Sequence, residues 1–263
     1  EVMTFNFAMQ AMDQIINSAA KTRYRSGGQM SCPIVFRGPN GAAARVGAQH
    51  SQDYSAWYAS VPGVKVIAPY FAADAKGLLK AAIRDPNPVI YMEHKKLYRS
   101  VRNEVPEDDY VIPIGKADIK RPGADLTIVA YSYMLHKSLE AAERAAAAGI
   151  DCEVIDLRTV YPWDQDMVLE SVKKTGRLLI VHEDIRTCGI GGEIAATAAD
   201  ECFEYLDAPI RRVTPPEVPT LPFAPAMDAY FMTNHDKIVA AVEEIAADEA
   251  ARGGGGRPRG ASA

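Results

Sequence analysis

Several features that define whole classes of protein are missing from this sequence. No apolar run reaches the roughly 18 residues that a membrane-spanning helix needs. No block of basic residues indicates a nucleic-acid surface, and the formal net charge is −5. We therefore expect neither a membrane nor a nucleic acid as a partner.

Cysteine is also scarce. The sequence has only four cysteines, Cys32, Cys152, Cys188 and Cys202. None of them has another cysteine at the short spacing that is typical of a zinc site or a disulfide framework. We interpret them as reduced, mostly packed residues of an intracellular protein.

The sequence does contain enough apolar residues for a large core. Of its 263 residues, 48% are hydrophobic, which suits one or two domains. Stretches with the period of a strand alternate with stretches of helical period, in the manner of βαβ units. This alternation predicts an α/β fold in which helices cover both faces of parallel sheets.

The first half of the chain carries one such alternation. Apolar residues at helical spacing predict a helix over 5–19, which should be interfacial or core. The other expected elements are strands at 32–36, 64–68 and 88–91 and a helix at 72–84. Charged, proline-containing sequence from 98 to 125 then predicts a connector.

A second alternation follows the connector. The expected strands are at 126–131, 152–157, 177–181 and 210–213, and the expected helices at 134–148, 167–174, 192–205 and 235–247. We place the domain boundary near residue 120, which gives domains at 1–118 and 119–249. The glycine-rich segment 250–263 has few apolar residues and should be a disordered tail.

A lone histidine lies in a glycine-rich loop. The segment Phe36–Gln52 follows the strand expected at 32–36 and places Arg37, Asn40 and His50 beyond it. Ligands of parallel α/β proteins collect at the carboxyl ends of strands. A single loop histidine is more often a surface or hydrogen-bonded residue than a catalyst, so chemistry alone leaves both interpretations open.

Long stretches of the chain resemble one family. They are EVMTFNFAMQAMDQIINSAAK (1–21), CPIVFRGPNG (32–41), AQHSQ (48–52), VKVIAPYFAADAKGLLKAAIRDPNPVIY (64–91) and CEVIDLRTVYPWD (152–164). Together they resemble the beta subunit of the pyruvate dehydrogenase decarboxylating component, over nearly everything up to about Glu244. That family belongs to the thiamine diphosphate enzymes that resemble transketolase. The resemblance implies two transketolase-like domains, a pyrimidine-binding-type parallel-sheet domain and a carboxyl-terminal α/β domain.

The resemblance also implies partners and an activity. Two beta subunits would join two alpha subunits in a heterotetramer that decarboxylates a 2-oxo acid oxidatively. The acyl group would pass to the lipoyl group of a dihydrolipoyl acyltransferase core. Thiamine diphosphate would be shared with the alpha subunit, which would also carry magnesium. We expect a bacterial cytoplasmic location, or the mitochondrial matrix if the source is eukaryotic.

Compared with that family, the chain begins abruptly at Glu1, and no strand precedes its first helix. The segment that is absent normally contributes the glutamate that hydrogen-bonds the aminopyrimidine of thiamine diphosphate. We therefore expect an amino-terminally truncated pyrimidine-binding domain, in which no residue takes that role. A chain with only these residues is not expected to catalyse. It would instead serve as a docking platform for the alpha subunit and the acyltransferase core.

Four site residues follow from the resemblance, position by position. Phe7 matches the aromatic residue that packs against the aminopyrimidine ring, and Met3 matches an apolar neighbour of that ring. Gln10, one turn further on, would reach the site or the alpha subunit. His50 matches the active-site histidine, which assists proton transfer around the cofactor intermediate and the incoming lipoyl group. Without the family, Phe7 and Met3 are explained equally well as part of a helix packing stripe.

A cation site follows in the same way. Ile34, Ala82, Ile83, Asp85 and Asn87 match a potassium site built largely from backbone carbonyls, with one carboxylate and one amide oxygen. Hard cations favour such oxygen ligands. The ion would order the loop that carries His50. The plain alternative is that Asp and Asn here only form a turn.

Different segments of the chain resemble relatives with different substrates. The first half is closest to pyruvate-specific members, whereas Glu93–Arg99, His182–Asp184 and Glu201–Leu206 look more like branched-chain 2-oxo acid or acetoin dehydrogenase beta subunits. We favour pyruvate, because the half that would carry the active site is the half that resembles pyruvate enzymes.

Two further motifs have a structural explanation. Cys188–Glu193 is glycine-rich but lacks the full dinucleotide fingerprint, so we predict a turn and a helix cap. His182, Glu183 and Asp184 follow an apolar strand, and no further ligand spacing supports a metal there. We expect them at a domain surface or a subunit contact, and we assign no role to His94.

Overall fold

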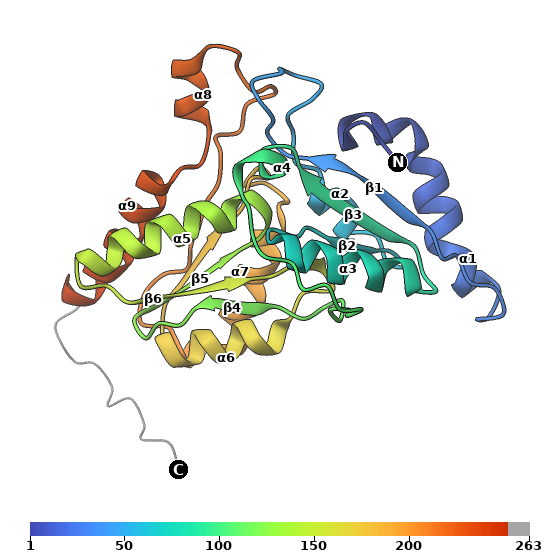
Figure 1. Cartoon of the computed structure of the whole chain (residues 1–263). Coiled ribbons are helices and arrows are strands. Elements are labelled where there is room, and N and C mark those ends of the chain that lie inside the picture. Colours follow the sequence, from blue (N-terminus) through green and yellow to red (C-terminus); the bar gives the residue numbers. More distant parts are fainter. Residues whose placement is uncertain (252–263) are drawn as a thin grey trace.

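The structure is a computed structural model that describes residues 1–251, and side chains up to residue 248 (Figure 1). The expected disordered tail at 250–263 falls outside the residues whose side chains are described. Among the described residues, no helix combines the length and the apolar character needed to cross a membrane. The described chain folds around two sheets, as the alternating pattern predicts.

The first sheet has the strand order β1-β3-β2-β7. Its strands are β1 (Val35–Asn40), β2 (Lys65–Ile67), β3 (Val89–His94) and β7 (Thr159–Tyr161). The first three are parallel, whereas β7 pairs antiparallel with β2. The second half of the chain therefore contributes an edge strand to the sheet of the first half.

The second sheet has the strand order β4-β6-β5-β8-β9. Its strands are β4 (Asp118–Arg121), β5 (Leu126–Ala130), β6 (Cys152–Asp156), β8 (Leu178–Val181) and β9 (Arg211–Val213). All neighbours are parallel except β4, which pairs antiparallel with β6. The predicted parallel sheets are thus confirmed, each with one short antiparallel strand at an edge, as is common in such folds.

Helices cover the sheets. They are η1 (Phe5–Ala11), η2 (Gln14–Ala19), α1 (Ala20–Arg25), α2 (Ser55–Ala59), α3 (Ala72–Arg84), α4 (Leu97–Ser100), α5 (Ser132–Ala147), α6 (Gln165–Thr175), α7 (Ile190–Glu201), η3 (Phe203–Tyr205), α8 (Pro225–Phe231) and α9 (His235–Ala251). Figure 1 shows α5 and α9 side by side on one face of the second sheet and α6 on its other face. The helix predicted over 192–205 ends at Glu201 and is followed by the separate turn η3.

The first strand differs most from its prediction. Cys32 and Pro33 precede the strand, and β1 continues through Arg37 to Asn40. Pro33 lacks the N–H that a sheet ladder uses, whereas Pro39 is tolerated because β1 is an edge strand. Arg37 and Asn40 therefore lie on β1 and not in the loop after it.

One apolar core joins the two sheets. Its buried members include Phe5, Val66 and Ile90 from the first half, and Ile155 and Ile180 from the second. Separate apolar layers fill the space under α3 and the space under α5 and α9. The two halves are consequently packed together along a continuous interior, which fixes the carboxyl ends of their strands relative to one another.

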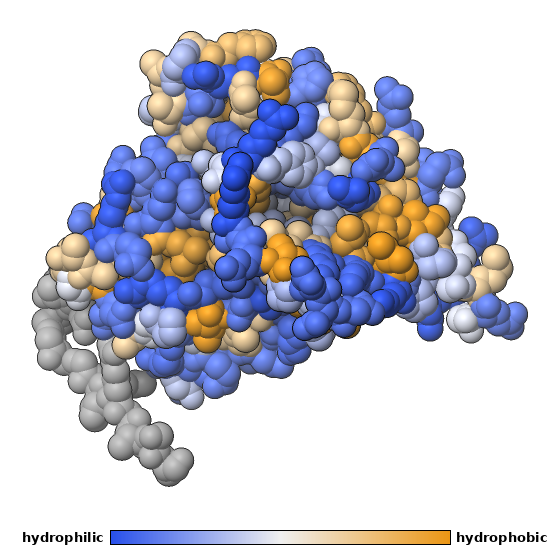
Figure 2. Space-filling model, in the orientation of Figure 1, coloured by the Kyte–Doolittle hydropathy of each residue, from blue (hydrophilic) through white to orange (hydrophobic). Residues whose placement is uncertain are grey.

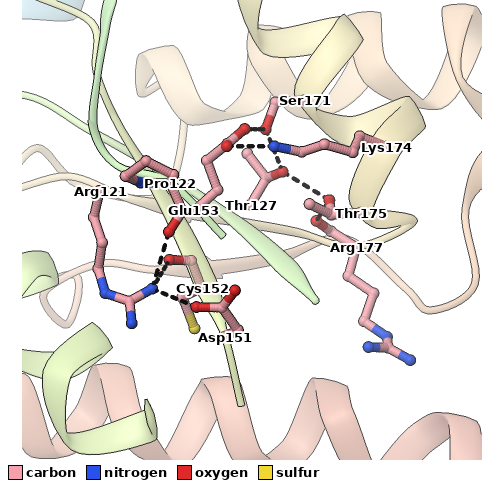
Figure 3. Close-up of polar contacts among 10 residues, drawn as sticks. All are labelled: Arg121, Pro122, Thr127, Asp151, Cys152, Glu153, Ser171, Lys174, Thr175 and Arg177. Atoms are coloured by element: carbon pink, nitrogen blue, oxygen red, sulfur yellow. Dashed lines mark hydrogen bonds and ion pairs between the residues drawn. The ribbon is translucent and has the colours of Figure 1, made fainter. Parts of the chain in front are cut away.

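A polar network lies under α6 (Figure 3). The Thr127 hydroxyl is 2.7 Å from the hydroxyls of Ser171 and of Thr175. Ser171 in turn donates to the carboxylate of Glu153 at 2.6 Å, and Lys174 pairs with the same carboxylate. Since Glu153 is buried, its charge depends on these two partners from α6.

Replacing Glu153 with Gln should lower stability modestly, because the Lys174 charge loses its buried partner. Lys174 is half exposed, so we expect a loss of only about 1 kcal/mol, or about 2–4 °C in melting midpoint for a chain of this size. The matched control is Glu170→Gln, which breaks an exposed pair with Lys173 on the same helix. Equal midpoints for both variants in a thermal melt would show that the buried pair contributes no more than the exposed one.

Candidate functional site

The loop between β1 and α2 carries the predicted histidine. The Gly41 N–H donates to the carbonyl of Gln52 at 2.9 Å, which closes the loop on itself. We call residues 41–52 the His50 loop. His50 lies near its closing end and is half-buried.

The structure brings Phe7 and His50 together, although 43 positions separate them. Their ring centroids are 5.1 Å apart at an interplanar angle of 76°, an edge-to-face contact. Phe7 is 41% exposed and Met3 is 62% exposed, so both present apolar surface outward from η1 and from the segment before it. Gln10, further along η1, is also exposed. A flat apolar surface therefore lies beside an imidazole.

Hydrogen bonds hold the two segments in register. Asn6, next to Phe7, donates from its side-chain amide to the side-chain carbonyl of Gln52, two residues after His50. The Thr4 hydroxyl donates to the side-chain amide oxygen of Asn6 at 2.9 Å and so orients that amide. The Asn6–Gln52 hydrogen bond thus links the segment that carries Phe7 to the loop that carries His50.

Below the loop, Asn40 and Asp53 form its base. The Asn40 side chain donates to Asp53 at 2.6 Å and accepts from the Tyr54 N–H at 3.0 Å. Asp53 also accepts from the Ser55 N–H at 2.8 Å. The Ser55 hydroxyl lies 2.9 Å from the hydroxyl of Tyr131, which comes from the second half of the chain.

Glu183 reaches the loop from the second sheet. It accepts a hydrogen bond from the Ala42 N–H, and its other oxygen lies 2.9 Å from Nε2 of His94. Burial acts to raise the pKa of Glu183, but the interactions with His94 and the Ala42 N–H outweigh it and hold the pKa below its usual value. Glu183 is therefore a carboxylate at neutral pH.

The segment between β9 and α9 also contacts the loop. We call residues 214–232 the arm, which carries α8 and lies beside the His50 loop in Figure 1. Leu221, Phe231 and Met232 of the arm form a small buried cluster with Ala42. Figure 2 shows apolar surface over the arm, where Phe223 is exposed. Apolar packing thus adds to the polar contact at Ala42.

Gly47 shows how closely the arm approaches. Its φ is +78°, a conformation that glycine adopts without strain. A Cβ at this position would lie 2.4 Å from the Phe223 ring. The backbone conformation therefore favours glycine here, and a larger residue would also displace the exposed Phe223 ring.

A cavity of about 210 Å³ lies behind the loop. It is lined by both halves of the chain, including Ser51, Asp53, Glu183, Asp184 and Leu221. The Ser51 hydroxyl is buried and has no hydrogen-bond partner among the residues that the structure describes. Burial, and then the charge of Asp53, raise the pKa of Asp184 to about 8. Burial and the charge of Glu183 raise the pKa of Asp53 as well.

The positions predicted for potassium gather around one turn. The Ile34 carbonyl accepts from the Val89 N–H at 2.9 Å, and the Ala82 carbonyl accepts from the Asp85 N–H at 3.3 Å. Asp85 accepts from the backbone and side-chain amides of Asn87 at 2.8 and 3.0 Å. Ile83 is exposed beside them.

The Asp85 carboxylate already faces a cation, the Lys65 ammonium. Burial acts to raise its pKa, but the hydrogen bonds from Lys65 and Asn87 lower it below the usual value. Within residues 1–251, no group of three or more His, Cys, Asp and Glu side chains is placed to hold a metal. The predicted potassium site depends on main-chain carbonyls instead.

The structure shows where two further sequence motifs lie. The turn and helix cap at Cys188–Glu193 are confirmed, because Gly189 is the N-cap of α7. His182, Glu183 and Asp184 lie where one half of the chain faces the other, and their expected contact with another subunit stays a prediction. All three side chains are buried against the loop or under α7, because they follow β8 at the edge where the two halves meet. Polar residues directly after an apolar strand were the signal for this site.

Comparison with known proteins agrees with this architecture. Residues 1–101 match the family Transketolase, pyrimidine binding domain, and residues 115–238 match the family Transketolase, C-terminal domain. A solved structure described as split gene transketolase, inactive beta4 tetramer, is similar with a TM-score of 0.72 and 26% identity, covering 94% of this chain and 75% of that one. The expected transketolase-like fold is confirmed.

Curated relatives are more similar in sequence. The pyruvate dehydrogenase E1 component subunit beta of Rhizobium meliloti (strain 1021) is 56% identical over 93% of this chain and 53% of its own length. The same subunit of Rickettsia felis (strain ATCC VR-1525 / URRWXCal2) is 54% identical over 93% and 74%. The 2-oxoisovalerate dehydrogenase subunit beta of Bacillus subtilis (strain 168) is 49% identical over 94% and 75%. The chain thus spans between half and three quarters of these relatives, and the resemblance inferred from sequence is confirmed.

The raised pKa of Asp184 predicts a pH-dependent stability. In the unfolded chain this carboxyl titrates near 3.9, so between about pH 4 and about pH 8 the folded state binds more protons than the unfolded state. Stability should therefore fall as pH rises through this window. Asp184→Asn should flatten the dependence and gain at least about 1.4 kcal/mol relative to the original chain at the high-pH end, the equivalent of one pKa unit.

Urea midpoints measured across the same window test this expectation. The control is Asp13→Asn, an exposed helical position that should leave the pH profile unchanged. Parallel profiles for the original chain and for Asp184→Asn would contradict a protonated Asp184 behind the loop.

Proposed function

We propose, because the chain belongs to the family of E1 beta subunits built from transketolase pyrimidine-binding and C-terminal domains, that it is the beta subunit of a pyruvate dehydrogenase. The observation that carries this proposal is the contact between the exposed Phe7 ring and His50. It places an apolar stacking surface next to a group that transfers protons. Oxidative decarboxylation of a 2-oxo acid needs both.

The residues around Phe7 fit thiamine diphosphate, the cofactor of this enzyme family. The exposed faces of Phe7 and Met3 offer apolar surface to an aminopyrimidine ring, and Gln10 offers an amide one turn away. When bound, the cofactor supplies the electron sink for the loss of carbon dioxide. The contribution of this chain is to pack the ring and exclude water from one side of it.

His50 takes the proton-transfer role. An imidazole both donates and accepts protons near neutral pH, which typically contributes roughly 10² to 10⁴ in rate. Its ring is held from one side by Phe7, and its loop is held by the Asn6–Gln52 hydrogen bond. We propose that it moves a proton during acyl transfer to the lipoyl group.

The partners follow from the same proposal. Relatives are named as subunits of an E1 component, which supports an alpha subunit as partner in a heterotetramer of two alpha and two beta subunits. The alpha subunit would hold magnesium and the diphosphate. A dihydrolipoyl acyltransferase core would receive the acyl group. The location would be the bacterial cytoplasm or the mitochondrial matrix, since relatives include bacterial and mitochondrial forms.

We also propose the domain boundary at residues 118 and 119, at the start of β4. The matched families end at residue 101 and begin at residue 115 on either side of the irregular connector. The first strand of the second sheet then belongs to the carboxyl-terminal domain.

Three alternatives differ in substrate or in role. The 49% identity to a 2-oxoisovalerate dehydrogenase subunit beta supports a branched-chain 2-oxo acid, and an acetoin dehydrogenase beta subunit is a related choice. A docking subunit without its own chemistry is the third. Pyruvate is favoured because two of the three relatives described above are pyruvate dehydrogenase subunits.

The decisive experiment is an assay of lipoyl acylation, which detects acyl transfer from 2-oxo acids and from acetoin alike, with the native protein co-expressed with its alpha subunit. Initial rates with thiamine diphosphate and magnesium are compared for pyruvate, for branched-chain 2-oxo acids and for acetoin. We expect the highest kcat/KM for pyruvate. We also expect His50→Ala to lower lipoyl acylation by about 10² or more, while the heterotetramer still assembles.

Each outcome separates the alternatives. A preference for branched-chain acids or acetoin would replace pyruvate as the substrate. A stable heterotetramer without activity on any of these would favour the docking role. An unchanged acylation rate for His50→Ala would remove His50 from the mechanism.

Potassium provides a separate test. If the carbonyls of Ile34 and Ala82 and the Asp85 carboxylate bind this ion, the folded state gains free energy by mass action. The melting midpoint should then rise by about 2–4 °C for each kcal/mol gained when potassium chloride replaces sodium chloride at equal ionic strength. Choline chloride serves as the control for ionic strength. Identical midpoints in the three salts would argue against a potassium site at this turn.

A further inference from the structure

The start of the His50 loop is held by a buried carboxylate from the other half of the chain. Glu183 lies two residues after β8, and its side chain is 8% exposed. One oxygen accepts from the Ala42 N–H and the other lies 2.9 Å from Nε2 of His94. A buried charge requires such partners, so Glu183 and the loop start are mutually dependent.

The orientation of His94 is fixed by contacts on two sides. Its Nδ1 accepts from the Lys96 N–H at 3.2 Å, which leaves the proton on Nε2 facing Glu183. The Tyr133 ring stacks on the imidazole at 5.1 Å and 20°. His94 ends β3 directly opposite Asn40, the last residue of β1. The imidazole is therefore a rigid partner at the point where the loop leaves the sheet.

The surroundings of Gly41 show how closely Glu183 and His94 pack against the loop. Its φ is +79°, and a Cβ would lie 2.7 Å from Nε2 of His94 and 2.9 Å from Oε1 of Glu183. The N–H of the same glycine closes the loop on Gln52. A shift at residues 41 and 42 would therefore also move Gln52, which accepts the hydrogen bond from Asn6 and so positions His50 beside Phe7.

From this geometry we infer that Glu183 is a positioning residue, which sets the place of His50 through the Ala42 N–H and His94. The inference rests on the proposed role of His50. Glu183 itself faces the loop backbone, so it acts on the reaction only through that loop. Its effect should disappear when His50 is absent, because two residues that act as a unit are not additive.

The test is a double-mutant cycle on the assembled heterotetramer with thiamine diphosphate and magnesium. The variants are Glu183→Gln, His50→Ala and the combination of both, assayed for lipoyl acylation and for the KM of the 2-oxo acid. Glu183→Gln should lower kcat by about tenfold, with KM changed less than about twofold. In the His50→Ala background, Glu183→Gln should change the rate of lipoyl acylation by less than about twofold.

Glu153→Gln is the matched control. It also neutralises a buried carboxylate of the second sheet, but one that faces α6 and not the loop. It should keep the original kcat. If the Glu183→Gln chain does not assemble, His94→Phe replaces it in the double-mutant cycle. This substitution removes the hydrogen-bond donor to Glu183 and keeps an aromatic ring against Tyr133.

Three results would overturn the inference. They are a Glu183→Gln variant as active as Glu153→Gln, a double variant whose loss is the product of the two single losses, and a loss confined to KM. Full activity of His50→Ala alone would instead refute the proposed function of His50. The two failures are therefore distinguishable.

Discussion

The arrangement of the site depends on one contact, between the buried Glu183 carboxylate and the backbone of the His50 loop. The loop packs against the arm at Ala42, and ordering its two positive-φ glycines at 41 and 47 costs conformational entropy that such contacts must offset. An ionised carboxylate in a buried setting strongly favours the conformation that offers it donors. The apolar core that runs through both sheets makes this contact possible, because it fixes the carboxyl end of β8 against the carboxyl ends of β1 and β3.

Local patterns predicted the elements well where the chain has long periodic segments. The helix predicted over 72–84 has the observed bounds of α3, and strong apolar runs located β5, β6 and β8 within two residues. The antiparallel strands β4 and β7 were missed because β4 lies in the charged stretch interpreted as a connector and only two residues separate β7 from the end of β6. The start of β1 was misplaced because Pro33 sits in an apolar run that looks continuous.

The site was only partly predictable. A histidine after a strand was visible in the sequence, and the resemblance assigned both His50 and Phe7 to one cofactor, but their direct contact was not predicted. Glu183 was seen as a polar residue after an apolar strand and His94 was given no role, because their burial and mutual contact depend on how the two sheets meet. No local rule contains that information, because 89 positions separate the two residues.

The same contact changes how the substrate signals are interpreted. The segments that look like branched-chain or acetoin relatives, Glu93–Arg99 and His182–Asp184, contain His94 and Glu183. In the structure these two side chains face each other and the start of the His50 loop. Their identities are therefore linked by a shared buried hydrogen bond, and a change in one constrains the other. Resemblance at these positions therefore has a structural explanation, the way the loop is held, besides any relation to the substrate.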